Sequence, residues 1–157
     1  MTDSELQKCK EQIKRHVGLR LCAYRDSRRR LRIGYGHIIA EIEGFNSFST
    51  ITQSIADMLF TDDFWDAFNV AEKAAAIDGS WDYLNVSRQA VLVNIAFNLN
   101  EIGLLEFSDA FDFIVAKEYD KAADAILATK WAKQAGDRAI ELARQMRTGE
   151  WQEGVAK

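Results

Sequence analysis

The residues best placed to do chemistry lie near the start of the chain, around one aspartate. Asp26 follows Tyr24-Arg25 at the start of a predicted turn, and Arg32 lies six positions further along. A guanidinium beside a carboxylate keeps it ionised and occupies its hydrogen-bonding sites. We therefore predict an ion pair between Asp26 and Arg32. The alternative is that Arg32 points into solvent at the rim of a basic hairpin.

The two cysteines, Cys9 and Cys22, are too few for a disulfide framework. We expect buried free thiols, which pack as small apolar groups, with a bridge or a redox role as the alternative. No spacing of histidine, cysteine and acidic residues is typical of a metal site, so we predict neither a metal nor a cofactor.

Composition narrows the class of protein. The 157 residues are 48% hydrophobic and 28% charged, as in an ordinary globular chain, and proline is absent. The net charge of −4 argues against nucleic acid as the main partner and, more weakly, against steering toward anionic wall polymers. One local exception is a cluster of arginines within thirteen positions: Arg20, Arg25, Arg28, Arg29, Arg30 and Arg32.

Periodicity predicts a mixed N-terminal part. Residues Ser4 to Val17 have apolar side chains at helical spacing, and Gly18 is a typical stop. From Leu21 to Ile39 the apolar residues alternate, which indicates a small antiparallel sheet. The Gly34 and Gly36 pair favours a close backbone approach or an unusual φ.

Everything after Thr52 has a helical pattern. We expect a short helix from Thr52 through Phe60, a second that Thr61 starts and that runs toward Gly79, and a buried central helix over Ala90 to Leu99 capped by Ser87. Shorter helices are predicted over 108–117, 119–129 and 137–147, with Trp131 and Trp151 as core anchors.

These elements predict a single α+β domain, mainly α. Its parts are an N-terminal helix-and-sheet lobe of about residues 1–60, a linking helix of about 62–79, and a helical lobe of about 80–157.

Several motifs in order resemble the phage-type lysozymes, the endolysins of the T-even phages (glycoside hydrolase family 24-like muramidases). They are residues 13–26 (IKRHVGLRLCAYRD), 31–37 (LRIGYGH), 87–90 (SRQA), 94–98 (NIAFN) and 147–151 (RTGEW), with Gly103, Phe107, Trp131 and Arg138. The match spans nearly the whole chain, apart from a shortened, rewritten stretch between Ile38 and Ile51. The resemblance implies a two-lobed lysozyme-like fold and hydrolysis of the glycosidic bond of peptidoglycan.

The catalytic residues of the family fall on changed positions. Its glutamate, aspartate and threonine align with Val17, Asp26 and Arg32, so that only Asp26 is retained. Glycoside cleavage usually needs two carboxyl groups, and valine has no proton to give. The sequence therefore predicts a protein with the fold of a cell-wall hydrolase and without its normal chemistry.

Three other carboxylates are candidates for a relocated acid. Glu101 lies beside the turn that faces the cleft in the family, and Glu41 and Glu43 lie in the rewritten stretch, although we expect surface charges at all three positions. His37 matches a family histidine, and we expect a hydrogen bond or ion pair with a neighbour. The resemblance places His37, Asn98 and Phe107 as candidate glycan-binding or cleft residues.

Three functions remain open at this point. The first is an inactive lysozyme-like protein that binds a protein partner or a glycan strand. The second is an active muramidase with a relocated acid, and the third is a structural component of a phage or cell-pole assembly. The apolar segment, Ile38, Ile39, Ile42, Phe45 and Phe48, either packs locally or forms a docking patch. We expect no membrane insertion and a cytoplasmic chain without a signal peptide, released to the wall or carried in a phage particle.

Overall fold

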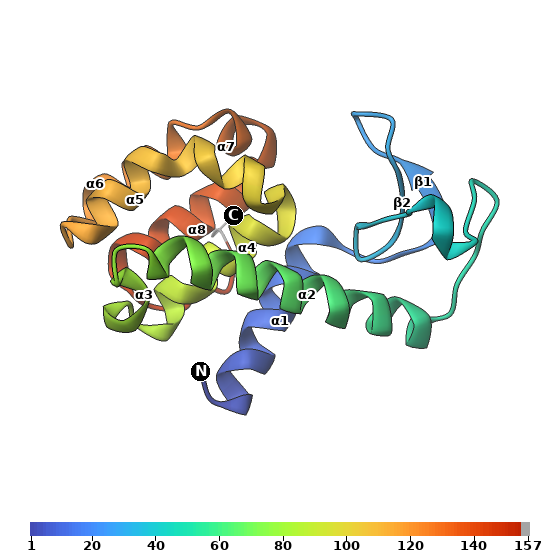
Figure 1. The fold of residues 1–157 in the computed structure, drawn as a ribbon, viewed down its shortest axis with the longest axis horizontal. Helices are drawn as coiled ribbons and strands as arrows, with labels where there is room; N and C mark the ends of the chain where they lie inside the picture. The colour runs from blue at the N-terminus through green and yellow to red at the C-terminus, as the bar shows by residue number, and fades with distance from the viewer. Residues whose placement is uncertain (155–157) are drawn as a thin grey trace. The chain divides into compact units, whose positions relative to one another are not determined.

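The fold is mainly helical with one small antiparallel sheet, as predicted. The computed structural model describes residues 1–154, apart from the side chains of residues 100–102. The chain divides into two compact units (Figure 1). We call residues Lys10–Asp66 the sheet unit, and Met1–Cys9 together with Ala67–Lys157 the helical unit.

The sheet unit contains the three strands. Helix α1 (Asp3–Val17) ends where Gly18 takes a φ of +72°, which glycine adopts without steric cost, so the predicted helix is confirmed. Strands β1 (Arg20–Arg25), β2 (Leu31–Gly34) and β3 (His37–Ile38) pair in that order, each antiparallel to the next. The sheet predicted between Leu21 and Ile39 is therefore confirmed.

A small core holds the sheet to the start of α2. Ile33, Ile51 and Ala56 are buried together, and Ile39 and Phe45 pack against them. Gly34 has a φ of +65°, and a Cβ added there would lie only 3.4 Å from the Cβ of Ala56. The predicted close backbone approach is therefore confirmed.

The rewritten stretch therefore has two faces. Ile39 and Phe45 belong to the core of the sheet unit, so including them in an exposed docking patch was wrong. The side chains of Ile38, Ile42 and Phe48 are exposed, the last two almost completely, at 96% and 93%. Ile42 lies in the 3-10 turn η1 (Glu41–Glu43).

Helix α2 (Gln53–Ala76) is continuous, so the prediction of two helices meeting at Thr61 was wrong. The Thr61 hydroxyl donates to the carbonyl oxygen of Asp57, one turn earlier, at 2.9 Å. A threonine in this bond sits inside a helix instead of capping a new one. No proline or glycine occurs within 53–76 to interrupt the helix.

The helical unit is built around α4 (Val86–Leu104), whose residues 90–93, 95 and 96 are buried. The cap of this helix is Asn85 and not Ser87, because the Asn85 Oδ1 accepts the N–H of Arg88 at 3.1 Å. The other helices are α3 (Ser80–Tyr83), the 3-10 turn η2 (Leu105–Phe107), α5 (Ser108–Val115), α6 (Tyr119–Leu127), α7 (Lys130–Ala135) and α8 (Asp137–Thr148).

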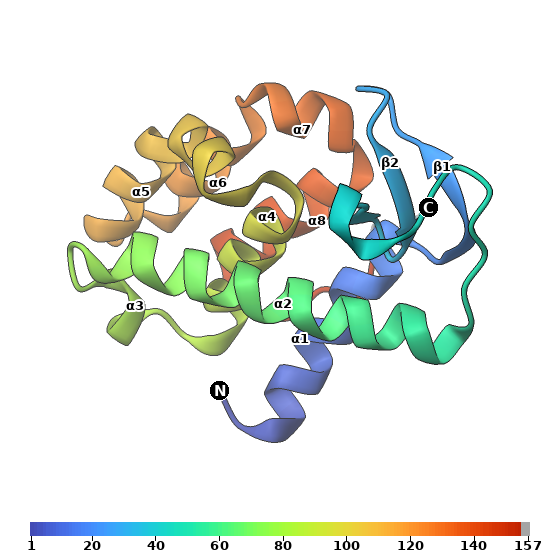
Figure 2. The ribbon, with the colours of Figure 1, turned by 45° about the vertical axis from the view of Figure 1, so that its right-hand side comes forward.

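The C-terminal helices α5 to α8 pack against one another (Figure 2). Helix α6 packs against both α5 and α8, and α8 also packs against α4. Trp131 of α7 is buried, as predicted, whereas Trp151 is only half-buried.

Both cysteines are free thiols, and their burial differs from the expectation. Cys9 is buried on α1, as predicted. Cys22 is exposed on β1, where its Sγ lies 3.6 Å from the hydroxyl of Thr50, so its predicted burial was wrong.

Arg29 has a left-handed backbone at the tip of the β1–β2 hairpin, with a φ of +63°. This conformation costs a residue with a Cβ roughly 1 to 2 kcal/mol, and glycine avoids the cost but loses more backbone entropy on folding. We expect Arg29→Gly to raise the free energy of unfolding by about 0.5–1 kcal/mol, measured by urea denaturation. Arg28→Gly is the matched control and should lower it, since Arg28 has no positive φ; equal effects at the two positions would contradict the prediction.

Candidate active site

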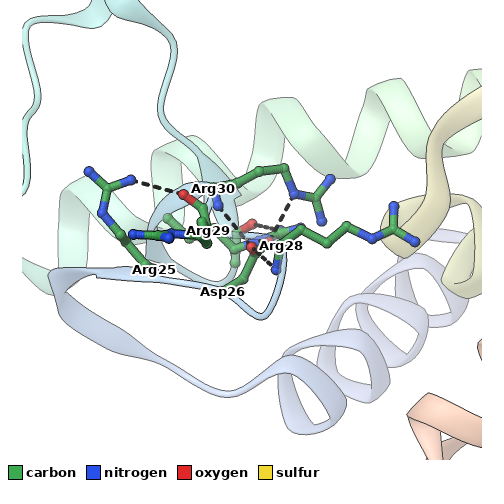
Figure 3. A network of polar contacts seen from close by, with 7 residues as sticks. Arg25, Asp26, Arg28, Arg29 and Arg30 are labelled. Carbon is green, nitrogen blue, oxygen red and sulfur yellow. Dashed lines mark hydrogen bonds and ion pairs between the residues drawn. The ribbon is translucent and has the colours of Figure 1, made fainter.

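The candidate site forms where β1 ends and the hairpin turns. Asp26 lies directly after β1, and both oxygens of its carboxylate are used within the hairpin (Figure 3). The backbone N–H groups of Arg28 and Arg30 donate to Oδ1, each at 2.9 Å. The Nε atoms of Arg30 and Arg32 donate to Oδ2, at 2.9 Å and 2.7 Å. A carboxylate has about four lone-pair positions, so that this one is saturated.

The arginines determine the protonation of this aspartate. Desolvation acts to raise the pKa of Asp26, but hydrogen bonds from Arg32 and Arg30 outweigh it and hold the pKa well below its usual range. The predicted Asp26–Arg32 pair is confirmed, and the alternative of Arg32 pointing into solvent is wrong. Arg32 also donates through Nη1 to the carbonyl oxygen of Gly36, which fixes the guanidinium against the hairpin.

Val17 is the last residue of α1 and is half-buried. Its side chain is aliphatic and can neither donate nor accept a proton. The end of α1 thus carries no acid at residue 17, and the carboxylate of Asp26 is fully engaged by its own hairpin. General acid–base chemistry needs a group with a proton to give and a group free to take one, and these two positions supply neither.

His37 forms a second polar cluster in the sheet unit. Its Nδ1 lies 2.8 Å from the Asp63 Oδ2 of α2, and its Nε2 lies 2.8 Å from the Glu43 Oε1 of η1. The hydrogen bond with Asp63 is the main cause that raises the pKa of His37 to about 9, with Glu43 adding to it and desolvation opposing it. The expected structural pairing is confirmed. With both ring nitrogens occupied, His37 offers no donor to a sugar.

A family model described as phage lysozyme matches residues 14–149, which is most of the chain. The chain belongs to the phage lysozyme family. The match begins inside α1 and ends at the residue after α8, so both compact units of this phage lysozyme family member contribute to it. Membership indicates a lysozyme-like role related to peptidoglycan.

The remaining candidate residues lie in different settings. Glu43 accepts the N–H of Ala40 and pairs with His37; desolvation acts to raise its pKa, but these bonds lower it, which is unsuitable for a proton donor. Glu41 is exposed, as expected of a surface charge. Glu101 lies on α4, and its side chain is outside the described residues.

Two family positions in the helical unit are engaged within the protein. The side chain of Asn98 is half-buried, and its Nδ2 donates to the carbonyl oxygen of Asn94 at 2.6 Å. Phe107 is buried and packs edge-on against Trp131, with ring centroids 5.8 Å apart. The aromatic ring of Phe107 therefore offers no exposed face for stacking on a sugar.

Sequence reasoning missed two ion pairs of the sheet unit. Arg30 shares the Asp26 carboxylate with Arg32, and the spacing of four positions between Asp26 and Arg30 within the turn was the available signal. Lys14 of α1 pairs with Asp57 of α2 at 2.6 Å, between elements 43 positions apart, which no local pattern indicates.

Among the described residues, no group of three histidine, cysteine or acidic side chains is placed to hold a metal ion. No described helix is long and apolar enough to cross a membrane.

Proposed function

We propose that this phage lysozyme family member no longer hydrolyses peptidoglycan and acts by binding, either to a protein partner or to a glycan strand. The observation that carries the proposal is the saturated carboxylate of Asp26. All four of its hydrogen bonds come from the hairpin itself, two from backbone N–H groups and two from arginine side chains. A carboxylate held in this way can neither activate a water molecule nor attack a sugar without first breaking these bonds.

Val17 adds to the effect of the occupied aspartate. General acid assistance is typically worth about 100- to 10,000-fold in rate, or roughly 3 to 5 kcal/mol of barrier. The Arg32 side chain occupies the position of the family threonine, and a guanidinium donates hydrogen bonds but accepts none. Both changes act on the same chemical step, so the expected loss of rate is large.

Binding to a protein is favoured by the exposed apolar residues of the rewritten stretch. Ile42 and Phe48 expose nearly their whole side chains, and Ile38 exposes 45%. Exposed apolar side chains close together in sequence are typical of interaction sites. This stretch is also where the sequence departs from the family pattern.

The test is a turbidity and zymogram assay on purified peptidoglycan at several pH values, with an active phage lysozyme as the positive control. We expect lysis by this chain to be at least about 100-fold slower per molecule than lysis by the control. Sedimentation with intact peptidoglycan and a partner pull-down then distinguish glycan binding from protein binding. Lysis at the rate of the control would end the proposal.

An active enzyme with a relocated acid is the second candidate. In that case Glu101 or Glu41 would act together with Asp26, and alanine replacement of these residues would abolish lysis. The third candidate, a structural component of a phage or cell-pole assembly, would bind a protein partner stably and show no affinity for glycan.

A further inference from the structure

The β1–β2 hairpin concentrates positive charge on a chain that is otherwise acidic. Residues 20–32 hold six arginines and one aspartate, a net charge of +5. Since the whole chain has a net charge of −4, all its other residues together carry −9. An anionic ligand is therefore attracted to one short segment and repelled by the rest of the chain.

Four of these arginines, Arg20, Arg25, Arg28 and Arg29, have no acidic partner among the described residues, and Arg20 instead stacks on Tyr24. Asp26 is shared by Arg30 and Arg32, and this is the hairpin's only carboxylate. Arg25 donates to the carbonyl oxygen of Arg29, and the side chains of Arg25, Arg28 and Arg29 are exposed. Each of these three guanidinium groups keeps N–H donors that an external anion can accept from.

The tip of the hairpin also keeps an arginine where the backbone disfavours one. Arg29 has a φ of +63°, and glycine or asparagine would occupy this position at less cost. A residue that keeps a disfavoured backbone conformation without a compensating contact is typical of a functional position. The Arg29 side chain forms no ion pair among the described residues that would compensate for the cost.

The directions of the side chains indicate the shape of the ligand. Figure 3 shows Arg25 leaving the turn on one side and Arg28 on the other. Guanidinium groups that point apart cannot converge on one phosphate, but they can each contact a different phosphate of a flexible chain. Arginine is suited to this contact because its planar fork matches phosphate oxygens.

We propose that the β1–β2 hairpin binds a flexible phosphodiester polymer of the kind found among the anionic polymers of bacterial walls. The proposal rests on the proposed function only in placing the chain at the cell wall. A wall polymer fits better than nucleic acid, because Tyr24 is the only aromatic residue of the hairpin, it is half-buried, and Arg20 covers one face of its ring at 3.9 Å, which leaves little aromatic surface for stacking on bases.

The probe is a fluorescently labelled poly(glycerol phosphate) oligomer, and binding is measured by anisotropy between 50 and 200 mM salt. Three phosphate contacts predict that the affinity falls about 20-fold over this range. The triple variant Arg25→Gln, Arg28→Gln, Arg29→Gln should bind at least 10-fold more weakly at low salt and lose most of the salt dependence. Circular dichroism of the triple variant verifies that the sheet unit is still folded.

The matched control removes the same charge elsewhere. Lys130, Lys133 and Arg144 are exposed in the helical unit, and replacing all three by glutamine should leave the affinity almost unchanged. Equal losses in the two triple variants would overturn the proposal, because net charge alone would then explain the binding. Undetectable binding of the probe by the unmodified chain would overturn it as well.

Two further arms separate the ligands. Single-stranded DNA with the same number of phosphates should bind more weakly than the probe, and tighter binding would assign the hairpin to nucleic acid instead. On peptidoglycan stripped of its anionic polymers, the hairpin variant and the unmodified chain should sediment equally. Failure of the proposed function would appear as lysis of this stripped material, which is a different readout from the anisotropy.

Discussion

The double variant Val17→Glu, Arg32→Thr is expected to hydrolyse peptidoglycan at least about 100-fold faster than the unmodified chain. The glutamate supplies the missing proton donor at the end of α1. The threonine removes one of the two guanidinium groups on Asp26, so that the Oδ2 atom regains a free lone pair. The loss of a charged hydrogen bond should also bring the pKa of Asp26 closer to its ordinary value.

Single changes and a control without an acid separate these contributions. Val17→Glu alone should recover only part of the activity, since Asp26 stays saturated, and Arg32→Thr alone should recover almost none. Val17→Gln with Arg32→Thr has the same shape as the active variant but no proton to donate, and it should remain inactive. If the double variant is folded and still inactive, the loss of activity has a cause beyond these two positions.

Replacing His37 by glutamine is expected to lower the free energy of unfolding by about 1 to 2 kcal/mol at pH 6, after allowance for solvent screening. The charged imidazole joins β3 to α2 through Asp63 and to η1 through Glu43. Glutamine is neutral and cannot form these ion pairs. Urea denaturation of the two proteins between pH 5 and pH 10 measures the difference.

The pH dependence identifies the charge as the cause. The pKa of His37 is raised to about 9 in the folded protein, from the ordinary value of 6.5. Its contribution is therefore complete below pH 6.5 and is lost as the pH rises through 9. The two proteins should differ most near pH 6 and least near pH 10. A difference that is independent of pH would show that packing of the ring, and not its charge, is responsible.

Asp63→Asn is the companion measurement. It removes the main cause of the raised pKa while leaving the histidine in place. The pKa of His37, followed by NMR of the ring protons, should fall toward its ordinary value, because desolvation then opposes only Glu43. An unchanged pKa would contradict the assignment of Asp63 as the main partner.

Local patterns in the sequence determined most of the secondary structure. The apolar spacing of α1, the alternation through β1 to β3 and the helices α5, α6 and α8 depend on neighbours within one or two turns, which a sequence displays directly; the short helix α7 was not predicted. The assignment of Val17, Asp26 and Arg32 to the catalytic positions of the family rests on the resemblance alone and stays a prediction. The Asp26–Arg32 pair followed from their proximity across a hairpin whose turn was itself predicted.

Contacts that a local sequence pattern does not show decided where α2 runs without a break and which apolar residues of the rewritten stretch are buried. Helix α2 is continuous because Thr61 bonds back to Asp57 within the helix, although the same three residues Thr61-Asp62-Asp63 would start a helix elsewhere. Ile39 and Phe45 are core residues while Ile42 and Phe48 are exposed, and composition alone cannot separate them.

The sequence by itself determined which chemical groups this protein has: one retained aspartate, no acid at position 17, and a cluster of arginines. Only the tertiary structure decided what those groups can do. It joined His37 to Asp63 across 26 positions and left four arginines of the hairpin without acidic partners among the described residues. The physical reason is that hydrogen bonds and ion pairs depend on distances of about 3 Å, which folding sets and spacing along the chain does not.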